Sequence, residues 1–439
     1  MKKWLSLLLI LAMICGICGV HAEEEPITFT ADEIKKAAWK AIDEKSYEKA
    51  LAYFELIAER GDAGGQYGLG YLYYMGLGVA QDYEKAAEYS RLAAAQGEVD
   101  ALYGYGLLCY EGSGMERSFE KAMEYWCKSA ALGGCDAYEA IGELFRDGEG
   151  VEQNDKKAAD YFLKAVELGE TEEAQACFDK MVKEGRIPAD YIMDPDIDPM
   201  CELGLMTVNH KDYDRALEYY GKAAEAGSRR GIYNLGVLYL NDLGVEQSDE
   251  KGMEYITRAA AAGYPLANTA LGNFYWLGEG VEQSSEKAAE YYAIAAEQGE
   301  VTAQSMLGYM YYAGEGVGKD YDKAISYYQA AAAQGDRMSF SNLGWAYYEG
   351  NGVEQSYEKA MEYSMKTAPL GEYHACDTIA ILYRDGLGVE QDVEKAADLF
   401  WMAWTLSGDQ RFKDEYDQLI KEGKIPADYT PKEVSFETK

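Results

Sequence analysis

Apolar and small residues recur three and four positions apart over most of the chain, the spacing typical of amphipathic helices. The stretch 267–275 shows this spacing, and a second stretch of the same kind covers 284–296. Between them stands Gly-Glu-Gly-Val at 278–281, whose glycines can adopt the positive φ of a tight turn. Gly299 follows the second stretch, where glycine commonly ends a helix. We therefore predict two antiparallel helices, which the small Gly272 lets approach closely.

The same pattern occurs eight times. The Gly-x-Gly-Val type turn begins at residues 76, 112 and 148 and, after an interruption, at 242, 278, 314, 350 and 386, with a spacing of 36 residues within each group. A fixed period of this length indicates a solenoid, in which each repeat buries its apolar face against its neighbours. The sequence therefore predicts an all-α fold, and its eight prolines agree with a mostly helical chain.

The interruption divides the repeats into two arrays with matching ends. The closing segment 179–191 is echoed by 417–429, and the opening segment 45–51 is echoed by 211–217. The distance along the chain between the two closing segments exceeds the distance between the two opening segments by twice the repeat length. The second array is therefore longer than the first by two repeats. We interpret the shared ends as caps that cover the outermost apolar faces. The predicted parts are a first array of three full repeats over 29–192, a joint rich in proline and aspartate over 193–202, a second array of five over 203–430, and a tail over 431–439.

These residues resemble the Sel-one-like repeat family, a relative of the tetratricopeptide repeat. The resemblance rests on Leu-Gly-x-x-Tyr-x-x-Gly-x-Gly-Val, followed by Lys-Ala and a final Ala-Ala-x-x-Gly, and it covers nearly all of the chain after residue 28. It implies a right-handed α/α solenoid of 36-residue helix-turn-helix repeats that serves as a protein-binding scaffold, often in bacterial envelope or signalling complexes. It also implies that the first helix of each repeat lines the concave side.

The segment 1–22 is typical of a secretory signal peptide. Two lysines precede an apolar stretch over 4–14, and small residues precede a cleavage site after Ala22. A spanning helix needs about 20 continuous apolar residues, which no other stretch offers. A bacterial lipoprotein with Cys15 or Cys18 as the lipidated residue is the alternative. We expect a periplasmic or secreted protein whose mature chain does not insert into the membrane.

The chain is strongly acidic, with 77 acidic against 41 basic residues and a formal net charge of −36. A field of this sign repels phosphate groups, so nucleic-acid binding is disfavoured. The acidic residues have two interpretations: they keep a tyrosine-rich surface soluble, or they form the footprint of a basic partner. The hydrophobic content of 48% is enough for a large buried core.

A Ser-x-x-Lys pattern raises the question of catalysis, because penicillin-recognising enzymes carry a serine nucleophile and a lysine at this spacing. It occurs at Ser118/Lys121, Ser248/Lys251, Ser284/Lys287 and Ser356/Lys359, whereas Asp82, Asn154, Asp320 and Asp392 replace the serine elsewhere. These residue types are interchangeable as helix N-caps and not as nucleophiles. We favour capping and predict no catalytic residue. A cell-wall or β-lactam hydrolase, by analogy with cysteine-rich relatives of the family, is the alternative.

Histidine and cysteine indicate no cofactor or metal. Beyond the predicted signal only His210 and His374 remain, and neither has a convincing set of ligands at metal-binding spacing. We interpret the six remaining cysteines as buried thiols: Cys109, Cys127, Cys135, Cys177, Cys201 and Cys376. In cysteine-rich relatives a disulfide joins the last turn of one repeat to the next repeat. Only Cys376 stands at such a position, with Ala368 as its expected partner.

The aromatic residues fall into two classes. Seven of the eight repeats have Tyr at one position of the second helix, such as Tyr291, and this constancy predicts a buried packing residue. The second class occupies the variable face of the first helix: Tyr67, Tyr71, Tyr74, Tyr103, Tyr110, Trp276, Tyr309, Tyr312, Trp345 and Tyr348, with Glu139, Glu143 and Arg146 in the third repeat instead. Exposed Tyr and Trp are typical of binding hot spots. We predict two aromatic strips that bind a protein or peptide, with contact between neighbouring repeats as the alternative.

Overall fold

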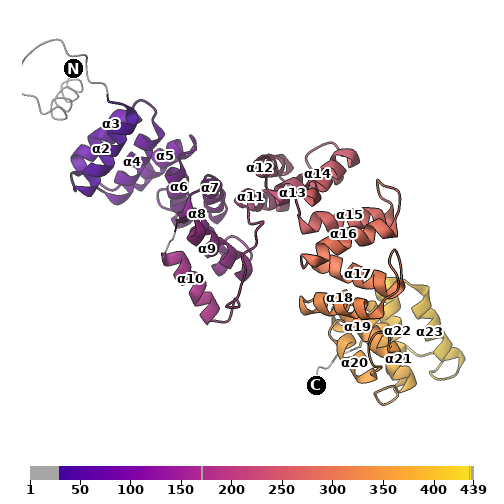
Figure 1. Ribbon diagram of the computed structural model, residues 1–439. Coiled ribbons are helices and arrows are strands. Elements are labelled where there is room, and N and C mark those ends of the chain that lie inside the picture. Colours follow the sequence, from indigo (N-terminus) through magenta and orange to yellow (C-terminus); the bar gives the residue numbers. More distant parts are fainter. Residues whose placement is uncertain (1–28, 170–171, 435, 437–439) are drawn as a thin grey trace, which may run out of the picture. The chain divides into compact units, whose positions relative to one another are not determined.

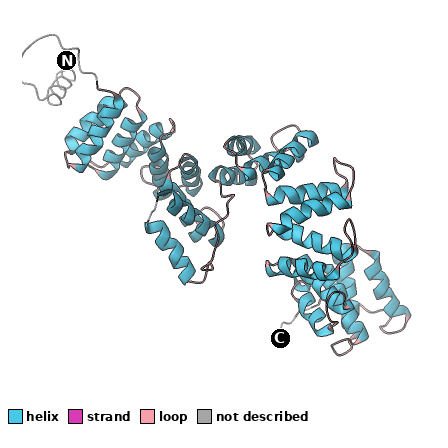
Figure 2. Ribbon diagram, viewed as in Figure 1, coloured by secondary structure: helices cyan, strands magenta, loops and turns pink. Residues whose placement is uncertain are grey.

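The chain folds into two compact units of antiparallel helices. The computed structural model describes residues 29–169, 172–434 and 436, so the predicted signal peptide lies outside the described residues. Unit 1 is Met1–Asp194 and unit 2 is Pro195–Lys439, a division that falls inside the proline- and aspartate-rich segment 193–202. Figure 2 shows helices joined by loops, and the described ranges contain no strand.

Unit 1 is a stack of helices in chain order (Figure 1). Its described helices are α2 (Ala31–Asp43), α3 (Tyr47–Ala58), α4 (Ala63–Met75), α5 (Tyr83–Ala94), α6 (Val99–Glu111), α7 (Phe119–Ala131), α8 (Cys135–Asp147), α9 (Asp155–Gly169) and α10 (Glu172–Lys183). Each helix packs against the next one along the chain, and α4 also contacts α2 and α6. The first helices of adjacent repeats therefore lie close together.

Unit 2 continues the same pattern over more repeats. Its helices are α11 (Pro199–Asn209), α12 (Tyr213–Glu225), α13 (Arg229–Leu240), α14 (Asp249–Ala261), α15 (Pro265–Leu277), α16 (Ser285–Glu297), α17 (Val301–Ala313), α18 (Tyr321–Ala333), α19 (Arg337–Glu349), α20 (Tyr357–Met365), the short η1 (Ala368–Leu370), α21 (Tyr373–Asp385), α22 (Val393–Ser407) and α23 (Gln410–Lys421). The predicted all-α solenoid of helix pairs is confirmed.

The hairpin of α15 and α16 shows how glycine shapes the repeat. Gly278 ends α15 with a φ of 75°, and Gly280 in the loop has a φ of 68°, conformations that glycine adopts without steric cost. At Gly272, an added Cβ would lie 2.5 Å from the ring of Tyr292 on α16. The predicted close approach of the two helices at this position is therefore confirmed.

The second helix buries its core aromatic one position later than the sequence suggested. Tyr292 is fully buried, with 0% of its surface exposed, and its hydroxyl donates to Oδ1 of Asn273 over 2.6 Å. Tyr291 is only half-buried and stacks on Tyr275, with ring centroids 5.6 Å apart. The prediction that Tyr291 is a buried core residue is therefore wrong. A stacked pair of aromatic rings recurs at this position along the stack, and only in the third repeat is its tyrosine, Tyr161, fully buried as predicted.

The two units close in the same way. In unit 1 the hydroxyl of Tyr191 donates to Oδ1 of Asp160 over 2.9 Å, and the same oxygen accepts from the backbone nitrogen of Asp194. In unit 2 the hydroxyl of Tyr429 donates to Oδ1 of Asp398, also over 2.9 Å. The repeated sequence at the two closing segments thus produces the same latch twice.

The closing helix of unit 2 covers the apolar end of the stack. Phe412, Tyr416 and Leu419 of α23 are buried together with Leu399 and Phe400 of α22. The helix α23 thus covers an apolar side of α22 that would otherwise be exposed at the end of the stack.

The openings are also alike. Lys45 and Lys211, each in the loop of the first hairpin of its unit, have φ of 58° and 61°. In unit 2 the side chain of Arg229 on α13 donates from Nε to Asp196 over 2.7 Å, which ties the start of the unit to its first repeat. The matching ends recognised in the sequence therefore correspond to matching local structures.

Candidate protein-binding faces on the first helices

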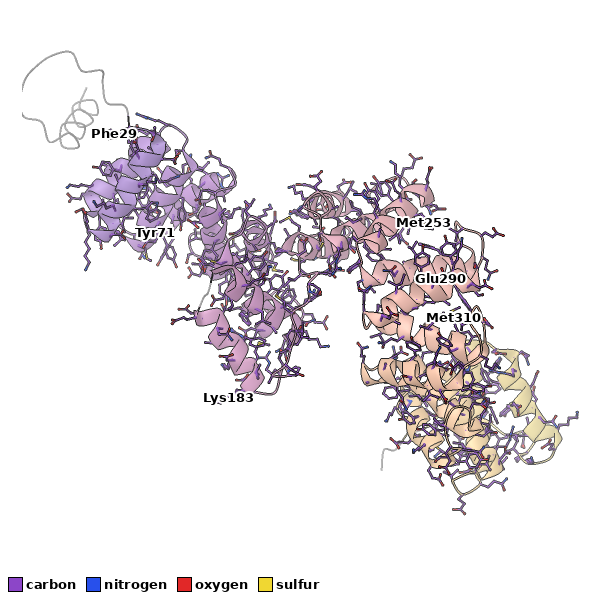
Figure 3. All side chains as sticks on the ribbon, in the orientation of Figure 1. Phe29, Tyr71, Lys183, Met253, Glu290 and Met310 are labelled. Carbon is purple, nitrogen blue, oxygen red and sulfur yellow. The ribbon has the colours of Figure 1, made fainter. Side chains whose placement is uncertain are left out.

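The ten predicted binding residues all lie on first helices. The aromatic strip of unit 1 comprises Tyr67, Tyr71 and Tyr74 of α4 with Tyr103 and Tyr110 of α6; the aromatic strip of unit 2 comprises Trp276 of α15, Tyr309 and Tyr312 of α17, and Trp345 and Tyr348 of α19. Tyr309 is 38% exposed, and the other nine are half-buried. Figure 3 labels Tyr71 on its helix.

In unit 1 the strip extends to a residue that sequence reasoning missed. Trp39 of α2 packs against Tyr67 and Tyr71, with ring centroids 5.8 and 5.5 Å apart. Tyr74 donates from its hydroxyl to Glu111 of α6 over 3.0 Å. Trp39 was missed because the opening hairpin lacks the Gly-x-Gly-Val turn that sets the register of the other repeats.

The second repeat of unit 1 holds its two strip tyrosines differently. Tyr103 stacks on the buried Trp126 of α7, with ring centroids 6.4 Å apart. Tyr110 donates from its hydroxyl to Glu149 over 2.7 Å, and the guanidinium of Arg117 lies over its ring at 5.2 Å. Both rings therefore contact their own repeat, while Tyr110 also reaches the loop of the next one.

In unit 2, strip residues also join neighbouring repeats. Trp276 of α15 and Tyr309 of α17 meet edge to face with centroids 6.0 Å apart, whereas Trp345 and Tyr348 pack against each other within α19 at 5.1 Å. Tyr312 donates from its hydroxyl to Glu349 over 2.6 Å. The hydroxyl groups of Tyr74, Tyr110 and Tyr312 thus contact the next repeat, while every strip residue remains partly exposed.

The strip position at the start of the first helix differs between repeats. Unit 1 has Tyr67 and Tyr103 there, and unit 2 has Tyr233 on α13 but buried small residues, such as Ser305 and Ser341, on later first helices. Ser305 accepts a hydrogen bond from Ser339 of the next first helix over 3.0 Å. The first helices α17 and α19 therefore pack closely at this level, whereas Tyr67, Tyr103 and Tyr233 are half-buried at the equivalent level of their helices.

The last repeat of each unit carries charged residues among its strip positions. In unit 1, Glu139, Glu143 and Arg146 occupy them on α8, and Arg146 pairs with Asp147 at 2.6 Å and with Glu143 at 3.2 Å. Burial raises the pKa of Glu139, and the charge of Glu143 raises it further. The half-buried Glu139 is thus held where its charge is poorly solvated.

In unit 2 the corresponding positions on α21 carry Asp377, Ile381 and Arg384. Burial raises the pKa of Asp377 to about 6. Arg384 pairs with Asp385 at 2.7 Å and with Glu415 of α23 at 2.8 Å. The first helix of this repeat therefore shares its arginine with the closing helix.

A model of the Sel1 repeat matches most of the chain. The matched segments are 43–62, 63–98, 99–134, 135–170, 200–228, 230–264, 265–300, 301–336, 341–366 and 374–403. This chain belongs to the Sel1 repeat family. Eight of the matches correspond to the repeats counted in the sequence, and the other two fall on the opening hairpins, which lack the glycine signature.

Several solved structures are similar to this chain. A Sel1 repeat protein from Oxalobacter formigenes is 21% identical over 93% of this chain and 99% of its own, with a TM-score of 0.47. A protective antigen present in uropathogenic Escherichia coli strains is 24% identical over 91% of this chain and 89% of its own, with a TM-score of 0.39. No curated protein matches the chain.

The Ser-x-x-Lys pattern has a structural role in these Sel1 repeats. Oγ of Ser284 accepts a hydrogen bond from the backbone nitrogen of Lys287 over 3.2 Å, as expected for an N-cap. The Lys287 ammonium lies 4.9 Å from the centroid of the Tyr275 ring. The same lysine-over-tyrosine contact recurs with Lys85, Lys251, Lys323 and Lys359 at 4.9 to 5.2 Å. Capping and cation–π contact therefore account for both residues of the pattern.

Five of the described cysteines are free thiols: Cys109, Cys135, Cys177, Cys201 and Cys376. Cys109, Cys127, Cys201 and Cys376 are buried, as predicted, whereas Cys135 and Cys177 are half-buried, which corrects the expectation for these two. Burial raises the pKa of Cys201 and of Cys376 to about 12, so neither is a thiolate near neutral pH. Sγ of Cys376 lies 4.0 Å from the carbonyl oxygen of Ala368, the partner that the family pattern indicated.

The described residues lack two further features. No three or more His, Cys, Asp and Glu side chains come together there in a way that could hold a metal ion. Across the same residues, none of the helices combines the length and the apolar character needed to cross a membrane.

Proposed function

We propose that this protein is an exported scaffold that holds a protein or peptide segment on the aromatic strips of its first helices. Membership in the Sel1 repeat family supports the role of an interaction scaffold. The observation that carries the proposal is that half-exposed aromatic rings from consecutive first helices contact one another, as Trp276 and Tyr309 do at 6.0 Å. Rigid, partly exposed aromatic side chains are the commonest anchors of protein interfaces.

The arrangement of the helices favours binding on this side. Contacts between first helices of adjacent repeats are found for α2 with α4, α4 with α6, α11 with α13 and α19 with α21. Close spacing on one side of a stack is expected on its concave side, where a peptide would meet side chains from several repeats at once.

Site-specific photo-crosslinking tests the proposal. A photoreactive amino acid replaces Tyr309 or Trp345 in the full-length chain, produced in the native cell, and the adducts are identified by mass spectrometry. The control position is Ile294 on the second helix α16, which is 45% exposed. We expect adducts with a polypeptide at the two strip positions and few at Ile294. Adducts at Ile294 alone, or no polypeptide adduct at either strip position, would overturn the proposed face.

Export is the second part of the proposal and rests on the sequence of the segment 1–22. N-terminal sequencing of the protein purified from its native cell tests it. We expect the mature chain to begin at Glu23 and to be recovered outside the cytoplasm. A chain that begins at Met1, or a lipidated Cys15 or Cys18, would contradict cleavage after Ala22.

A further inference from the structure

Unit 2 carries a half-buried aromatic ring at the same position of three consecutive first helices. Trp276 of α15, Tyr312 of α17 and Tyr348 of α19 are each separated by one repeat of 36 residues, and we call these three residues the aromatic row. In unit 1 the third repeat has Arg146 at this position, so the equivalent row ends after two tyrosines. A ligand that follows unit 2 from repeat to repeat would therefore meet three rings in succession.

Contacts within the chain hold the rings of the aromatic row in place. Tyr312 packs edge to face on Tyr321, the first residue of α18, with ring centroids 5.0 Å apart. Tyr348 packs in the same way on Tyr357, the first residue of α20, at 6.0 Å. Because these rings are already ordered, they lose little conformational entropy when a ligand covers their exposed faces.

Two indole nitrogens on this face are available as hydrogen-bond donors. In the part of the chain that the structure describes, Nε1 of Trp276 and Nε1 of Trp345 have no hydrogen-bond partner, and neither atom is buried. By contrast, Nε1 of Trp126 in unit 1 donates to the carbonyl oxygen of Tyr103 over 3.1 Å. The strip of unit 2 thus offers ring faces together with donors that a carbonyl oxygen of a bound chain could use.

The spacing of the row discriminates between backbone conformations of a bound polypeptide. Neighbouring first helices are in contact, since the rings of Trp276 and Tyr309 lie 6.0 Å apart and Ser339 donates to Ser305 over 3.0 Å. Helices in such contact lie about 8 to 10 Å apart. One turn of polyproline II, with about three residues of about 3.1 Å each, covers about 9 Å. A turn of α-helix covers about 5.4 Å and two residues of a strand about 7 Å, so neither matches the row.

A polyproline II segment also matches the chemistry of the row. It has no internal hydrogen bonds, so its carbonyl oxygens are free to accept from Trp276 and Trp345, whereas those inside an α-helix are already paired. Proline-rich segments bind to grooves lined with aromatic rings in other domains. The formal net charge of −36 disfavours an acidic segment, which the field of the chain would repel.

We propose that the aromatic row and Trp345 bind a proline-rich polypeptide segment without net negative charge, in the polyproline II conformation, with about one turn of the segment on each repeat. A proline of each turn lies on one ring of the row, and carbonyl oxygens between them accept from the two indoles. The inference rests on the proposed function, and it names the class of partner for unit 2.

Fluorescence anisotropy with labelled proline peptides, on the chain from residue 23 onward, tests this inference. Peptides of about four, seven and ten prolines span two rings, three rings and more than the row, and a Gly-Ser peptide of about ten residues is the negative probe. The test variant Trp276→Phe/Trp345→Phe keeps aromatic rings and removes both donors. The matched control is Trp401→Phe/Trp404→Phe, which removes two half-buried indoles from α22, outside the row. A thermal melt checks that each variant is folded.

We expect the proline peptides to bind and the Gly-Ser peptide not to bind. Affinity should rise severalfold between about four and seven prolines and by less than about twofold beyond, because the row has three rings. The test variant should lose about tenfold in affinity and the control less than about twofold. Tyr312→Leu, which interrupts the row, should abolish the gain between about four and seven prolines. Proline peptides that do not bind, a Gly-Ser peptide that binds equally well, or equal losses in the two double variants would each overturn the inference.

Failure of this inference can be distinguished from failure of the proposed function. The photoreactive amino acid at Trp345 or Tyr309 should capture a segment rich in proline. If the captured polypeptide segment contains no run of prolines, the scaffold stands and the proline-rich partner is wrong. If neither position captures a polypeptide, the proposed binding face itself is wrong.

Discussion

Tyr291 and Tyr292 are neighbours on α16 with opposite environments, and they offer a test of the packing at the residue scale. Tyr292→Ala removes a fully buried ring and leaves Asn273 without its hydrogen bond, so we expect a loss of about 3 to 5 kcal/mol of unfolding free energy. Tyr291→Ala removes one member of a half-exposed stack and should cost about 1 to 2 kcal/mol. Urea denaturation of both variants measures the difference. Equal losses would contradict the assignment of Tyr292 as the core residue.

The sequence could not make this distinction. The core position varies between repeats: Trp126, Phe162, Tyr292 and Tyr328 face a glycine of the first helix there, whereas Ser90 and Ser364 face the equivalent glycines Gly70 and Gly344. A position that holds both large rings and serine does not stand out, whereas the constant tyrosine beside it does. The tyrosine that recurs from repeat to repeat therefore identified a recurring aromatic contact, but not how deeply its ring is buried.

Asp377 should make stability depend on pH. Burial raises its pKa from an ordinary value of 3.8 to about 6, with Arg411, Glu415, Arg384 and Asp409 as the charged neighbours that modify it. Between the two pKa values, the folded chain keeps a proton on Asp377 that the unfolded chain has released. The stability from this group is therefore fully present below its unfolded pKa and is lost as the pH rises through about 6.

Asp377→Asn should therefore raise the Tm by a few degrees at about pH 7, with the gain shrinking towards about pH 4. Asp385→Asn is the matched control, because Arg384 lowers the pKa of Asp385 and the sign reverses. That variant should lower the Tm at neutral pH and approach the wild type in acid. Differential scanning fluorimetry across this pH range checks both. A pH-independent effect of Asp377→Asn would disprove the assignment of its charge.

At the scale of single elements, the start of α16 separates capping from catalysis. Ser284→Ala should cost about 1 kcal/mol because the first turn loses an acceptor, whereas Ser284→Asp should be nearly neutral. Lys287→Met keeps the apolar stem, loses the charge over Tyr275, and should cost about 0.5 to 1 kcal/mol. Thermal melts measure these effects. Hydrolysis of a β-lactam by the wild type, lost specifically in Ser284→Asp, would contradict the role of a scaffold.

Most of the elements could be predicted, because their causes are local. The 36-residue period, the turn glycines and the N-cap residues each act within one hairpin and are visible as spacing. The exposure of the strip residues could not be predicted, because it depends on contacts to another repeat. Trp39 packs on Tyr67, and Tyr312 reaches Glu349, through pairings that no spacing within one repeat reveals.

At the scale of the whole molecule, the duplicated ends suggest that the two units are autonomous. Each unit has its own opening hairpin, and each closes with a tyrosine bound to a buried aspartate, Tyr191 to Asp160 and Tyr429 to Asp398. A linear stack whose two ends are covered needs nothing from a neighbour to bury its core. The caps predicted from the sequence thus lead to an expectation about folding.

We expect residues 29–194 and 195–439, produced as separate fragments, each to show a helical circular dichroism spectrum and a cooperative unfolding transition in urea. The matched control is 195–408, which lacks α23 and so exposes the faces of Leu399 and Phe400 that Phe412 and Tyr416 cover. Because burying each such side chain contributes about 1.5 to 3 kcal/mol, this fragment should unfold at a much lower urea concentration or aggregate. If 29–194 is unfolded alone while the full chain is folded, unit 1 depends on unit 2 and its closing segment is not a cap.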